Sequence, residues 1–326
     1  MNLLYPLKFT PIFKDKVWGG DKIRTELGLD FSPLPNCGEV WVLSGVEGFQ
    51  TVVSNGFLEG NELNDLVEIY MDDLVGEKAF EQFPEKFPIL VKFIDSHDWL
   101  SIQVHPDDAL AAKRKIGNGK TEMWYILDAD KKAELISGFN QSVNQKIYLD
   151  YLEQKRLKEI LNVESVHAGD VFFMPAGRVH ALGPGVLLAE IQQTSDTTYR
   201  IYDWDRTDGE GKSRELHTDL ALEAIDFTIP DNYRTTYAKL KNQTVNLVES
   251  TAFTTNILEL DHGIKKDLEY IDSFIIYLCT SGSCSIQFLQ GMEELKKGEV
   301  ILIPATIDHL FILPKPKTKL LEIYYP

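Results

Sequence analysis

The sequence predicts a mainly β protein, built from two domains of the sandwich or barrel type with a few peripheral helices, and three observations support this. Most of the chain reads as short runs rich in β-branched and aromatic residues, separated by turn residues. Helical spacing of apolar residues is confined to a few segments. A strand–turn–histidine pattern also occurs twice, at 167–182 and 296–311. A duplicated β domain explains that repeat better than chance does.

The expected strands follow one another at short intervals. FPILVKFID at 87–95 is an apolar run interrupted only by Lys92, and LSIQVHP at 100–106 ends at Pro106, which lacks the amide proton that a strand needs. Period-two or continuous apolar patterns predict further strands at 121–130, 170–176, 186–193 and 198–205.

Three segments have apolar residues spaced three and four apart, the pattern of an amphipathic helix. They span 61–75, 145–161 and 217–227. The polar stretch 230–244 is expected to connect two domains. We therefore expect an N-terminal domain over 1–240, which contains the helical segments, and a C-terminal domain over 241–326.

Composition narrows the class of protein. The chain has 326 residues, with 33 Lys and Arg against 50 Asp and Glu, so its net charge of −17 argues against nucleic acid or an anionic membrane as partner. Cys37, Cys279 and Cys284 are odd in number and lack metal-type spacing, which predicts reduced thiols in a cytoplasmic protein. Neither a signal peptide nor a membrane span is expected.

The repeat can be aligned residue by residue. In both copies a glycine–acid pair opens an apolar strand, a Pro-Ala pair closes it, and a histidine follows. The corresponding positions are Gly169, Pro175 and His180 in the first copy, and Gly298, Pro304 and His309 in the second. The turn is expected to aim His180 into the barrel. A lone histidine is more often a packed polar residue than a ligand, so partners must decide its role.

Partners for His180 are found on two predicted strands. Gln103 and His105 lie two apart on one strand face, so they can chelate a single ion. Glu122 would add a carboxylate, giving a sulfur-free site suited to Zn²⁺, although ligand type also permits Fe²⁺, Mn²⁺ or Co²⁺. Gln103 could instead be an ordinary polar residue that lines the barrel and binds no metal. The second copy has no His or Glu on its corresponding strand, 274–289, so His309 is expected to lack partners and bind no metal.

The first copy spells G-x5-P-x-G-x2-H, which resembles the second signature of the cupin superfamily of jelly-roll barrels. LSIQVHPDD, GKTEMWYIL, MPAGRVHAL and TSDTTYRIYDWDR occur in this order and resemble type I mannose-6-phosphate isomerase (phosphomannose isomerase) in its short bacterial form, as does FTPIFKDKVWGG near the start. The resemblance implies two cupin-type jelly-roll barrels and interconversion of mannose 6-phosphate and fructose 6-phosphate. It also implies one Zn²⁺ per chain, bound by Gln103, His105, Glu122 and His180.

Such an isomerisation moves a proton between C1 and C2 through an enediol(ate), so it needs a base, an oxyanion partner and a hold on the phosphate. Arg200 matches the arginine that the family treats as catalytic, with a surface salt bridge to Asp203 or Asp205 as the alternative. Lys120, two residues from Glu122, could serve as acid or base, or could simply end a loop. Glu190 is a lone carboxylate in an apolar strand, suited to proton transfer, or to a buried pair with an arginine.

Four further residues are expected to contact the substrate, a small sugar phosphate. Lys92 and Ser101 fit phosphate contacts, although Lys92 could instead snorkel to the barrel edge. Trp18 is expected to form an aromatic wall, with a core position as the alternative. Asp196 could shuttle a proton or cap a turn. The histidines assigned structural roles are His97, His167, His217 and His262. A monomer or weak homodimer is expected.

Two other functions fit part of this pattern. Two histidines and one carboxylate also describe a non-haem iron cupin oxygenase. A non-catalytic sugar-binding cupin is the second alternative, although such a protein could dispense with either Lys120 or Arg200, which are both present. Metal content and isomerase activity distinguish the three functions.

Overall fold

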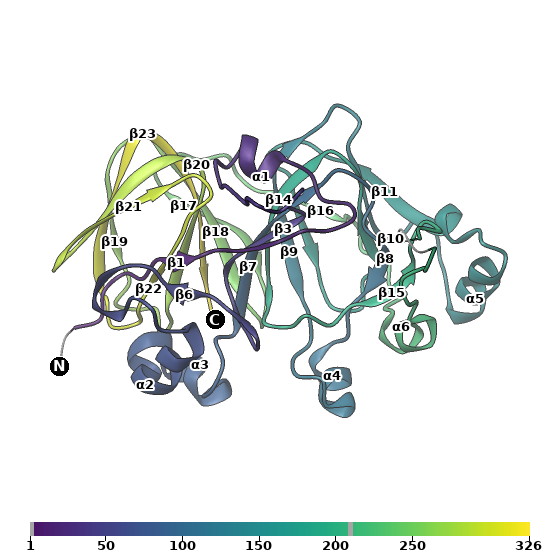
Figure 1. The fold of residues 1–326 in the computed structure, drawn as a ribbon, viewed down its shortest axis with the longest axis horizontal. Coiled ribbons are helices and arrows are strands. Elements are labelled where there is room, and N and C mark those ends of the chain that lie inside the picture. Colours follow the sequence, from purple (N-terminus) through teal and green to yellow (C-terminus); the bar gives the residue numbers. More distant parts are fainter. Residues whose placement is uncertain (1–2, 208–210) are drawn as a thin grey trace.

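The computed structural model describes residues 3–207 and 211–326, and strands dominate it (Figure 1). A seven-stranded antiparallel sheet forms one wall of the N-terminal half. Its order is β16 (Arg234–Thr235), β12 (Val171–Met174), β9 (Glu122–Ala129), β14 (Val186–Gln193), β7 (Ile89–Ser96), β3 (Glu39–Leu43) and β2 (Ile12–Lys14). The expected strands at 87–95, 121–130, 170–176 and 186–193 therefore belong to one sheet.

A five-stranded antiparallel sheet forms the opposite wall. Its order is β11 (Leu161–Ser165), β10 (Glu134–Phe139), β13 (His180–Leu182), β8 (Ile102–Val104) and β15 (Tyr199–Tyr202). One apolar cluster joins the inner faces of the two walls: it contains Trp124 and Leu188 from the larger sheet and Leu135 and Leu182 from the smaller one. The interior between the sheets is therefore the place where side chains from β8, β9 and β13 can meet.

The C-terminal half contains a second seven-stranded sheet, built around the long pair β20 (Ile275–Phe288) and β23 (His309–Tyr324), drawn in yellow and yellow-green in Figure 1. The other members are β17 (Thr244–Glu249), β18 (Thr254–Leu260), β19 (Ile264–Asp267), β21 (Gly291–Lys296) and β22 (Val300–Ile303). Two short ladders complete the described strands, β1 (Phe9–Thr10) with β6 (Val52–Val53), and β4 (Gly45–Val46) with β5 (Phe49–Gln50).

The helices lie at the periphery. They are α1 (Lys22–Thr25), α2 (Leu63–Val75), α3 (Glu77–Gln82), α4 (Asp108–Arg114), α5 (Gln145–Glu153) and α6 (Thr218–Ala224), with 3-10 turns η1 (Gly56–Leu58) and η2 (Leu157–Ile160). The helix expected at 145–161 ends early, because Lys155 adopts a left-handed backbone conformation with φ of 57° and the chain then enters η2 and β11. In the described part of the chain, no helix has the length and apolar character needed to cross a membrane.

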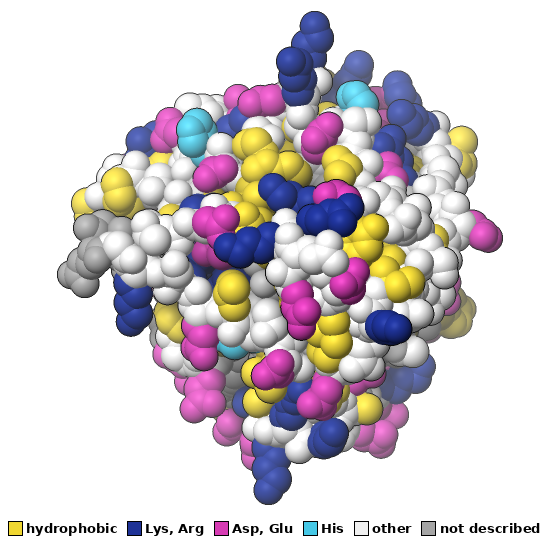
Figure 2. Space-filling view, turned by 90° about the vertical axis from the view of Figure 1, so that its right-hand side faces the viewer, with side chains coloured by type: hydrophobic (Ala, Val, Ile, Leu, Met, Phe, Trp, Pro, Cys, Tyr) yellow, Lys and Arg dark blue, Asp and Glu magenta, His cyan; other side chains and the backbone are white. Residues whose placement is uncertain are grey.

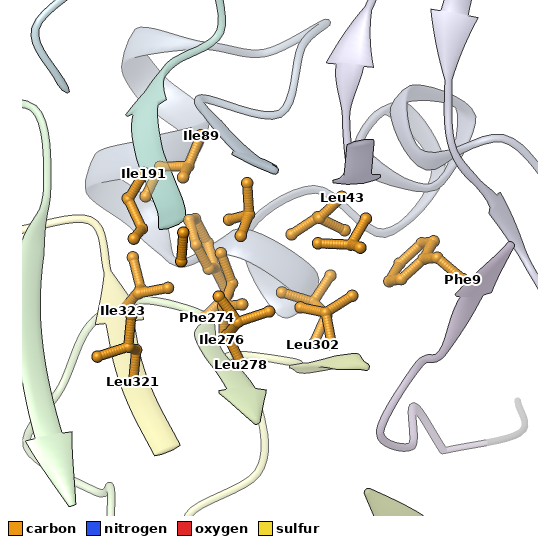
Figure 3. Close-up of a cluster of buried hydrophobic side chains, with 14 of the residues drawn as sticks. Phe9, Leu43, Ile89, Ile191, Phe274, Ile276, Leu278, Leu302, Leu321 and Ile323 are labelled. Carbon is orange, nitrogen blue, oxygen red and sulfur yellow. The ribbon is translucent and has the colours of Figure 1, made fainter. Parts of the chain in front are cut away.

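One apolar core extends through both halves of the chain (Figure 3). Leu43 and Ile89 from the N-terminal half lie in the same buried cluster as Phe274, Leu302 and Ile323 from the C-terminal half. The backbone also crosses between the halves, since Leu7, two residues before β1, pairs with Leu302 of β22. In that pair, Leu7 N donates to Leu302 O at 2.8 Å and Leu302 N donates to Leu7 O at 2.9 Å. The segment just before β1 is thus hydrogen-bonded to the C-terminal half, while β1 itself pairs with β6.

The two copies of the repeat form equivalent structures up to the histidine. β12 and β22 are matching four-residue strands, and the glycines that precede them, Gly169 and Gly298, have φ of 91° and 86°, a region that favours glycine. The histidines then differ: His180 is buried, whereas the His309 side chain is about half exposed. His309 also has a partner, contrary to expectation, because its Nδ1 lies 3.5 Å from Asp267 Oδ1 at the surface.

The face at the α5 and α6 end of the molecule carries mixed charge. Figure 2 shows lysine and arginine side chains there interspersed with acidic and apolar ones. Opposite charges therefore offset one another locally on this face, despite the net charge of −17 of the whole chain.

Candidate metal centre and substrate cavity

Three predicted ligands converge between the two sheets of the N-terminal half. Glu122 begins β9, His180 begins β13, and His105 directly follows β8. His105 Nε2 lies 3.5 Å from Glu122 Oε2, and His180 Nε2 lies 3.3 Å from Glu122 Oε1. All three side chains are buried, and their ligand atoms lie within 4.8 Å of one another. The facing sheets thus assemble a potential metal-binding group from three separate strands.

Backbone carbonyls orient both imidazoles. His105 Nδ1 lies 3.0 Å from Thr197 O, and His180 Nδ1 lies 2.9 Å from Arg178 O. A carbonyl only accepts, so each Nδ1 must carry the proton, and each Nε2 keeps its lone pair toward Glu122. Burial lowers the pKa of His180 to about 4 and lowers the pKa of His105 well below its usual value, an effect that the charge of Lys120 reinforces for His105. Both imidazoles are therefore neutral near pH 7, as metal ligands must be.

The Glu122 carboxylate fits a bound cation. Both of its oxygens are buried, and neither accepts a hydrogen bond from the described residues. A buried carboxylate without such donors is costly unless a positive charge compensates it. The nearest protein charge is Lys120, whose Nζ lies 3.2 Å from Glu122 Oε2 and 3.1 Å from His105 Nε2. Two neutral imidazoles and one carboxylate form a donor set that suits Zn²⁺ and related divalent ions.

Gln103 lies beside this group, with its amide nitrogen toward it. Its Nε2 is 3.2 Å from His180 Nε2, and its Oε1 accepts a hydrogen bond of 3.3 Å from Ser101 Oγ. Only the amide oxygen can bind a metal, so direct ligation by Gln103 requires its amide to turn over. The structure brings Gln103 to the site without presenting its oxygen there.

A cavity of about 260 Å³ opens beside the metal-binding group. It is lined by Gln103 and by all seven residues predicted to act in catalysis or substrate binding, namely Trp18, Lys92, Ser101, Lys120, Glu190, Asp196 and Arg200. Residues that the sequence analysis did not single out also line it, including Lys16, Glu39, Thr198 and Arg214. A signal existed for Lys16, which precedes Trp18 by two residues in KVWGG.

Lys92 and Glu190 form a buried ion pair in the cavity wall. Lys92 Nζ lies 2.8 Å from Glu190 Oε1, and Trp124 Nε1 donates to Glu190 Oε2 at 2.8 Å. The partner of Glu190 is thus a lysine, whereas the sequence suggested an arginine. Burial opposes the charge of Lys92, but the carboxylates of Glu190 and Glu39 outweigh burial and raise its pKa. Lys92 neither snorkels to the surface nor offers an unpaired ammonium to a phosphate.

Arg200 makes neither of the salt bridges considered from the sequence. Its Nη1 donates to Glu215 O at 2.8 Å, and its backbone N donates to His217 Nδ1 at 3.1 Å. His217, assigned a structural role, therefore anchors the backbone of a cavity residue. Asp203 instead accepts hydrogen bonds from two other arginines, Arg206 and Arg214. Burial, followed by the charge of Arg214, lowers the pKa of Arg200.

The remaining predicted residues lie at different depths. Trp18 is buried in the apolar cluster between the sheets and also lines the cavity, so it occupies a core position and borders the space where a ligand would bind. Ser101 is buried beside Gln103, whereas Asp196 is exposed at the edge of the cavity. Three of the remaining histidines are exposed away from the site, namely His97, His167 and His262.

Comparisons with known proteins agree with this geometry. Residues 6–143 match the model of the family described as phosphomannose isomerase type I, catalytic domain. The chain is 33% identical over 305 residues to a mannose-6-phosphate isomerase of Streptococcus mutans, covering 93% of each protein. It is 35% identical over 303 residues to mannose-6-phosphate isomerase ManA of Bacillus subtilis, covering 92% of this chain and 93% of the relative.

Solved structures show the same overall arrangement. A crystal structure of mannose 6-phosphate isomerase from Bacillus subtilis matches with a TM-score of 0.87 at 30% identity, covering 98% of this chain and 99% of the other. A putative mannosephosphate isomerase from Archaeoglobus fulgidus matches with a TM-score of 0.77 at 20% identity, covering 98% of this chain and 97% of the other. The second likeness concerns the fold alone.

Proposed function

Because the chain belongs to the type I phosphomannose isomerase family, we propose that it is an enzyme that interconverts mannose 6-phosphate and fructose 6-phosphate. The observation that carries the proposal is the buried His105–Glu122–His180 group beside a cavity lined by Lys120, Glu190 and other polar residues. Relatives named mannose-6-phosphate isomerase cover nearly all of the chain, which supports the same reaction.

We further propose that the group holds one Zn²⁺ per chain. His105, Glu122 and His180 would supply three ligands, and Gln103 a fourth after its amide turns over. A bound divalent cation supplies Lewis acidity toward the sugar oxygens. The two Nδ1–carbonyl hydrogen bonds fix the imidazoles so that Nε2 of each points to the ion. Fe²⁺ remains the competing ion, because its ligand preferences overlap with those of Zn²⁺.

Lys120 and Glu190 are the groups that we assign to proton transfer between C1 and C2. Both are buried side chains that line the cavity, so a sugar bound there would meet them away from bulk water. Lys92 and Trp124 hold the Glu190 carboxylate in place through its two oxygens. Lys120 lies beside the ligands and can donate to a developing oxyanion at the sugar. Trp18 would flank the sugar ring as an apolar wall.

The arrangement of sheets supports a finer description of the fold. We propose two cupin-type jelly-roll domains, a catalytic one over about residues 1–240 and a metal-free one over 241–326. The first strand segment and a shared apolar core bind them together. The three cysteines are free, in keeping with a cytoplasmic enzyme, and we expect a monomer or weak homodimer.

The decisive experiment is a coupled mannose-6-phosphate isomerase assay on purified protein, before and after chelation, with metal analysis of the same sample. We expect stoichiometric zinc, turnover that chelation abolishes, and recovery when Zn²⁺ is added. Bound iron without turnover would favour the non-haem iron oxygenase instead. Sugar binding without turnover in any metal form would favour the non-catalytic sugar-binding protein.

A further inference from the structure

A cluster of arginines forms one end of the substrate cavity. Asp203 is buried and accepts hydrogen bonds from Arg214 Nε at 2.7 Å and from Arg206 Nη2 at 2.6 Å. Arg200 lies next to this cluster, and both Arg200 and Arg214 line the substrate cavity. The same two arginines also line an adjoining surface hollow, so they stand where the cavity meets solvent.

This arginine cluster carries excess positive charge. Arg206 and Arg214 share the buried carboxylate of Asp203, and Arg206 Nη1 also lies 3.6 Å from Asp98 Oδ2. Arg200 has no carboxylate partner among the described residues, since its Nη1 donates to a neutral carbonyl, Glu215 O. Burial is the main cause that lowers the pKa of Arg200, and the charges of Arg214 and Arg206 add to it, while the carboxylates of Asp203 and Glu215 oppose this shift without outweighing it. Arg200 Nε is moreover buried and has no hydrogen-bond acceptor among the described residues. An anion bound here would offset the positive charge and satisfy this donor.

The other cations of the cavity already have carboxylate partners. Lys92 Nζ lies 2.8 Å from Glu190 Oε1, whereas Lys120 faces Glu122, the proposed metal ligand, at 3.2 Å. Lys16 Nζ lies 3.3 Å from Glu39 Oε1. The wall that holds Lys16 and Lys92 is therefore locally near neutral, and Lys120 belongs to the metal site, so the arginine end is the part of the cavity that offers positive charge away from the metal. An anionic ligand would therefore be oriented with its charged group toward Arg200 and Arg214.

We propose that Arg214, together with Arg200, binds the phosphate group of the sugar phosphate, and that Asp203 positions Arg214 for this contact. The inference rests on the proposed function and adds a specificity-determining residue to it. Asp203 engages Nε and Nη2 of Arg214, which fixes the plane of the guanidinium and leaves Nη1 outside that interaction. A fixed guanidinium fork suits phosphate oxygens better than a flexible ammonium does.

The test measures mannose 6-phosphate kinetics and inhibition by inorganic phosphate for the metal-loaded full chain. We expect Arg214→Ala to raise both KM and the inhibition constant for phosphate by about 10- to 100-fold, because charge-assisted hydrogen bonds are lost. The maximal rate should fall far less, since the phosphate does not react. Arg214→Lys should give intermediate constants, because it keeps the charge without the fork.

The matched control is Lys212→Ala. Lys212 lines the adjoining hollow but not the substrate cavity. Because salt screens its charge over that distance, both constants should stay within about twofold of those of the unmodified enzyme. Equal constants for Arg214→Ala and Lys212→Ala would overturn the inference. A loss confined to the maximal rate would overturn it as well.

Two readouts separate this inference from the proposed function. If the unmodified protein fails to isomerise mannose 6-phosphate, the proposed function is wrong, but calorimetric titration with inorganic phosphate still tests Arg214. Phosphate binding that Arg214→Lys or Arg214→Ala weakens would then support the site, and equal binding in all variants would refute it. Circular dichroism verifies the fold of each variant, and Arg214→Lys serves if the alanine variant does not fold.

Discussion

Glu122 is the only carboxylate in the converging group of predicted ligands, and both of its oxygens are buried and accept no hydrogen bond from the residues that the structure describes. We expect Glu122→Gln to lose bound metal to below about one tenth and activity by at least about a thousandfold, since the neutral amide removes the charge that attracts the cation. The fold should survive, because Lys120 borders the cavity and can turn into it. Metal analysis, the isomerase assay and circular dichroism measure these effects.

Glu164→Gln is the control for that substitution. Glu164 is partly buried on β11, where Arg234 Nη2 lies 3.4 Å from its Oε2. Glu164 is not one of the proposed metal ligands. Its replacement should leave metal content and turnover unchanged. A Glu122→Gln protein that keeps its metal would show that Glu122 is not a ligand.

The two buried imidazoles predict an acid-sensitive metal-free protein. His180 has a folded pKa of about 4, against about 6.5 in an unfolded chain, so the unfolded state takes up a proton first as the pH falls. The free energy of unfolding therefore decreases as the pH falls from about 6.5 to 4, by roughly 3 kcal/mol for His180. Urea unfolding of the chelated protein at pH 7, 6, 5 and 4 measures it, and His180→Gln should flatten the profile. Equal slopes for both proteins would contradict the prediction.

At the scale of single elements, the turn between β12 and β13 connects the metal site to α6. Gly177 N donates to His105 O at 2.9 Å, and Gly177 O accepts from Asp226 N at 2.8 Å. Its φ is 90°, and a Cβ would meet Ala224 O at 3.0 Å. We expect Gly177→Ala to lower the free energy of unfolding by about 2–3 kcal/mol, partly from the left-handed backbone and partly from this close approach.

Gly117 provides a control with the same backbone conformation. Its φ is also 90°, but a Cβ there would meet nothing within 4 Å. Gly117→Ala should therefore cost about 1–2 kcal/mol, the backbone contribution alone. Denaturant unfolding of both variants isolates the effect of the contact with Ala224. If the two variants lose equal stability, the packing of the turn against α6 contributes nothing.

The elements also show what a sequence can predict. The period-two pattern predicted that Gln103 and His105 face one site, and the helical spacing predicted the helix at 61–75, which the structure confirms as α2. Both predictions depend on local patterns, which a sequence shows directly. The ion pair of Lys92 with Glu190 depends on the pairing of β7 with β14, which no local pattern reveals. The sequence analysis missed Arg214 because it lies in a segment without regular structure. Its hydrogen bond to Asp203, which holds it beside the cavity, has no signal in the sequence.

At the scale of the whole molecule, the shared core predicts that both halves unfold together. Leu302 belongs to the C-terminal half, yet it lies in the cluster with Leu43 and pairs through its backbone with Leu7. We expect Leu302→Ala to lower the free energy of unfolding by about 2–5 kcal/mol. All five tryptophans precede residue 240, so fluorescence follows the N-terminal half, whereas far-ultraviolet circular dichroism follows both.

The expected result is one transition whose midpoint shifts equally by fluorescence and by circular dichroism. Leu289→Ala is the control, since Leu289 is 90% exposed and its truncation should change stability by less than about 0.5 kcal/mol. A fluorescence midpoint that stays constant while the circular dichroism midpoint moves would show that the halves unfold independently.

The pairing of Leu7 with Leu302 has a consequence for how the protein is made. A ribosome releases the segment around Leu7 early, but its partner on β22 emerges only when most of the chain has been synthesised. Until then the apolar side chains of the first segment have no place in a finished core, and they remain open to chaperones or to other nascent chains. The first segment therefore completes its backbone pairing only after β22 has been synthesised, whatever structure the intermediate sheets reach beforehand.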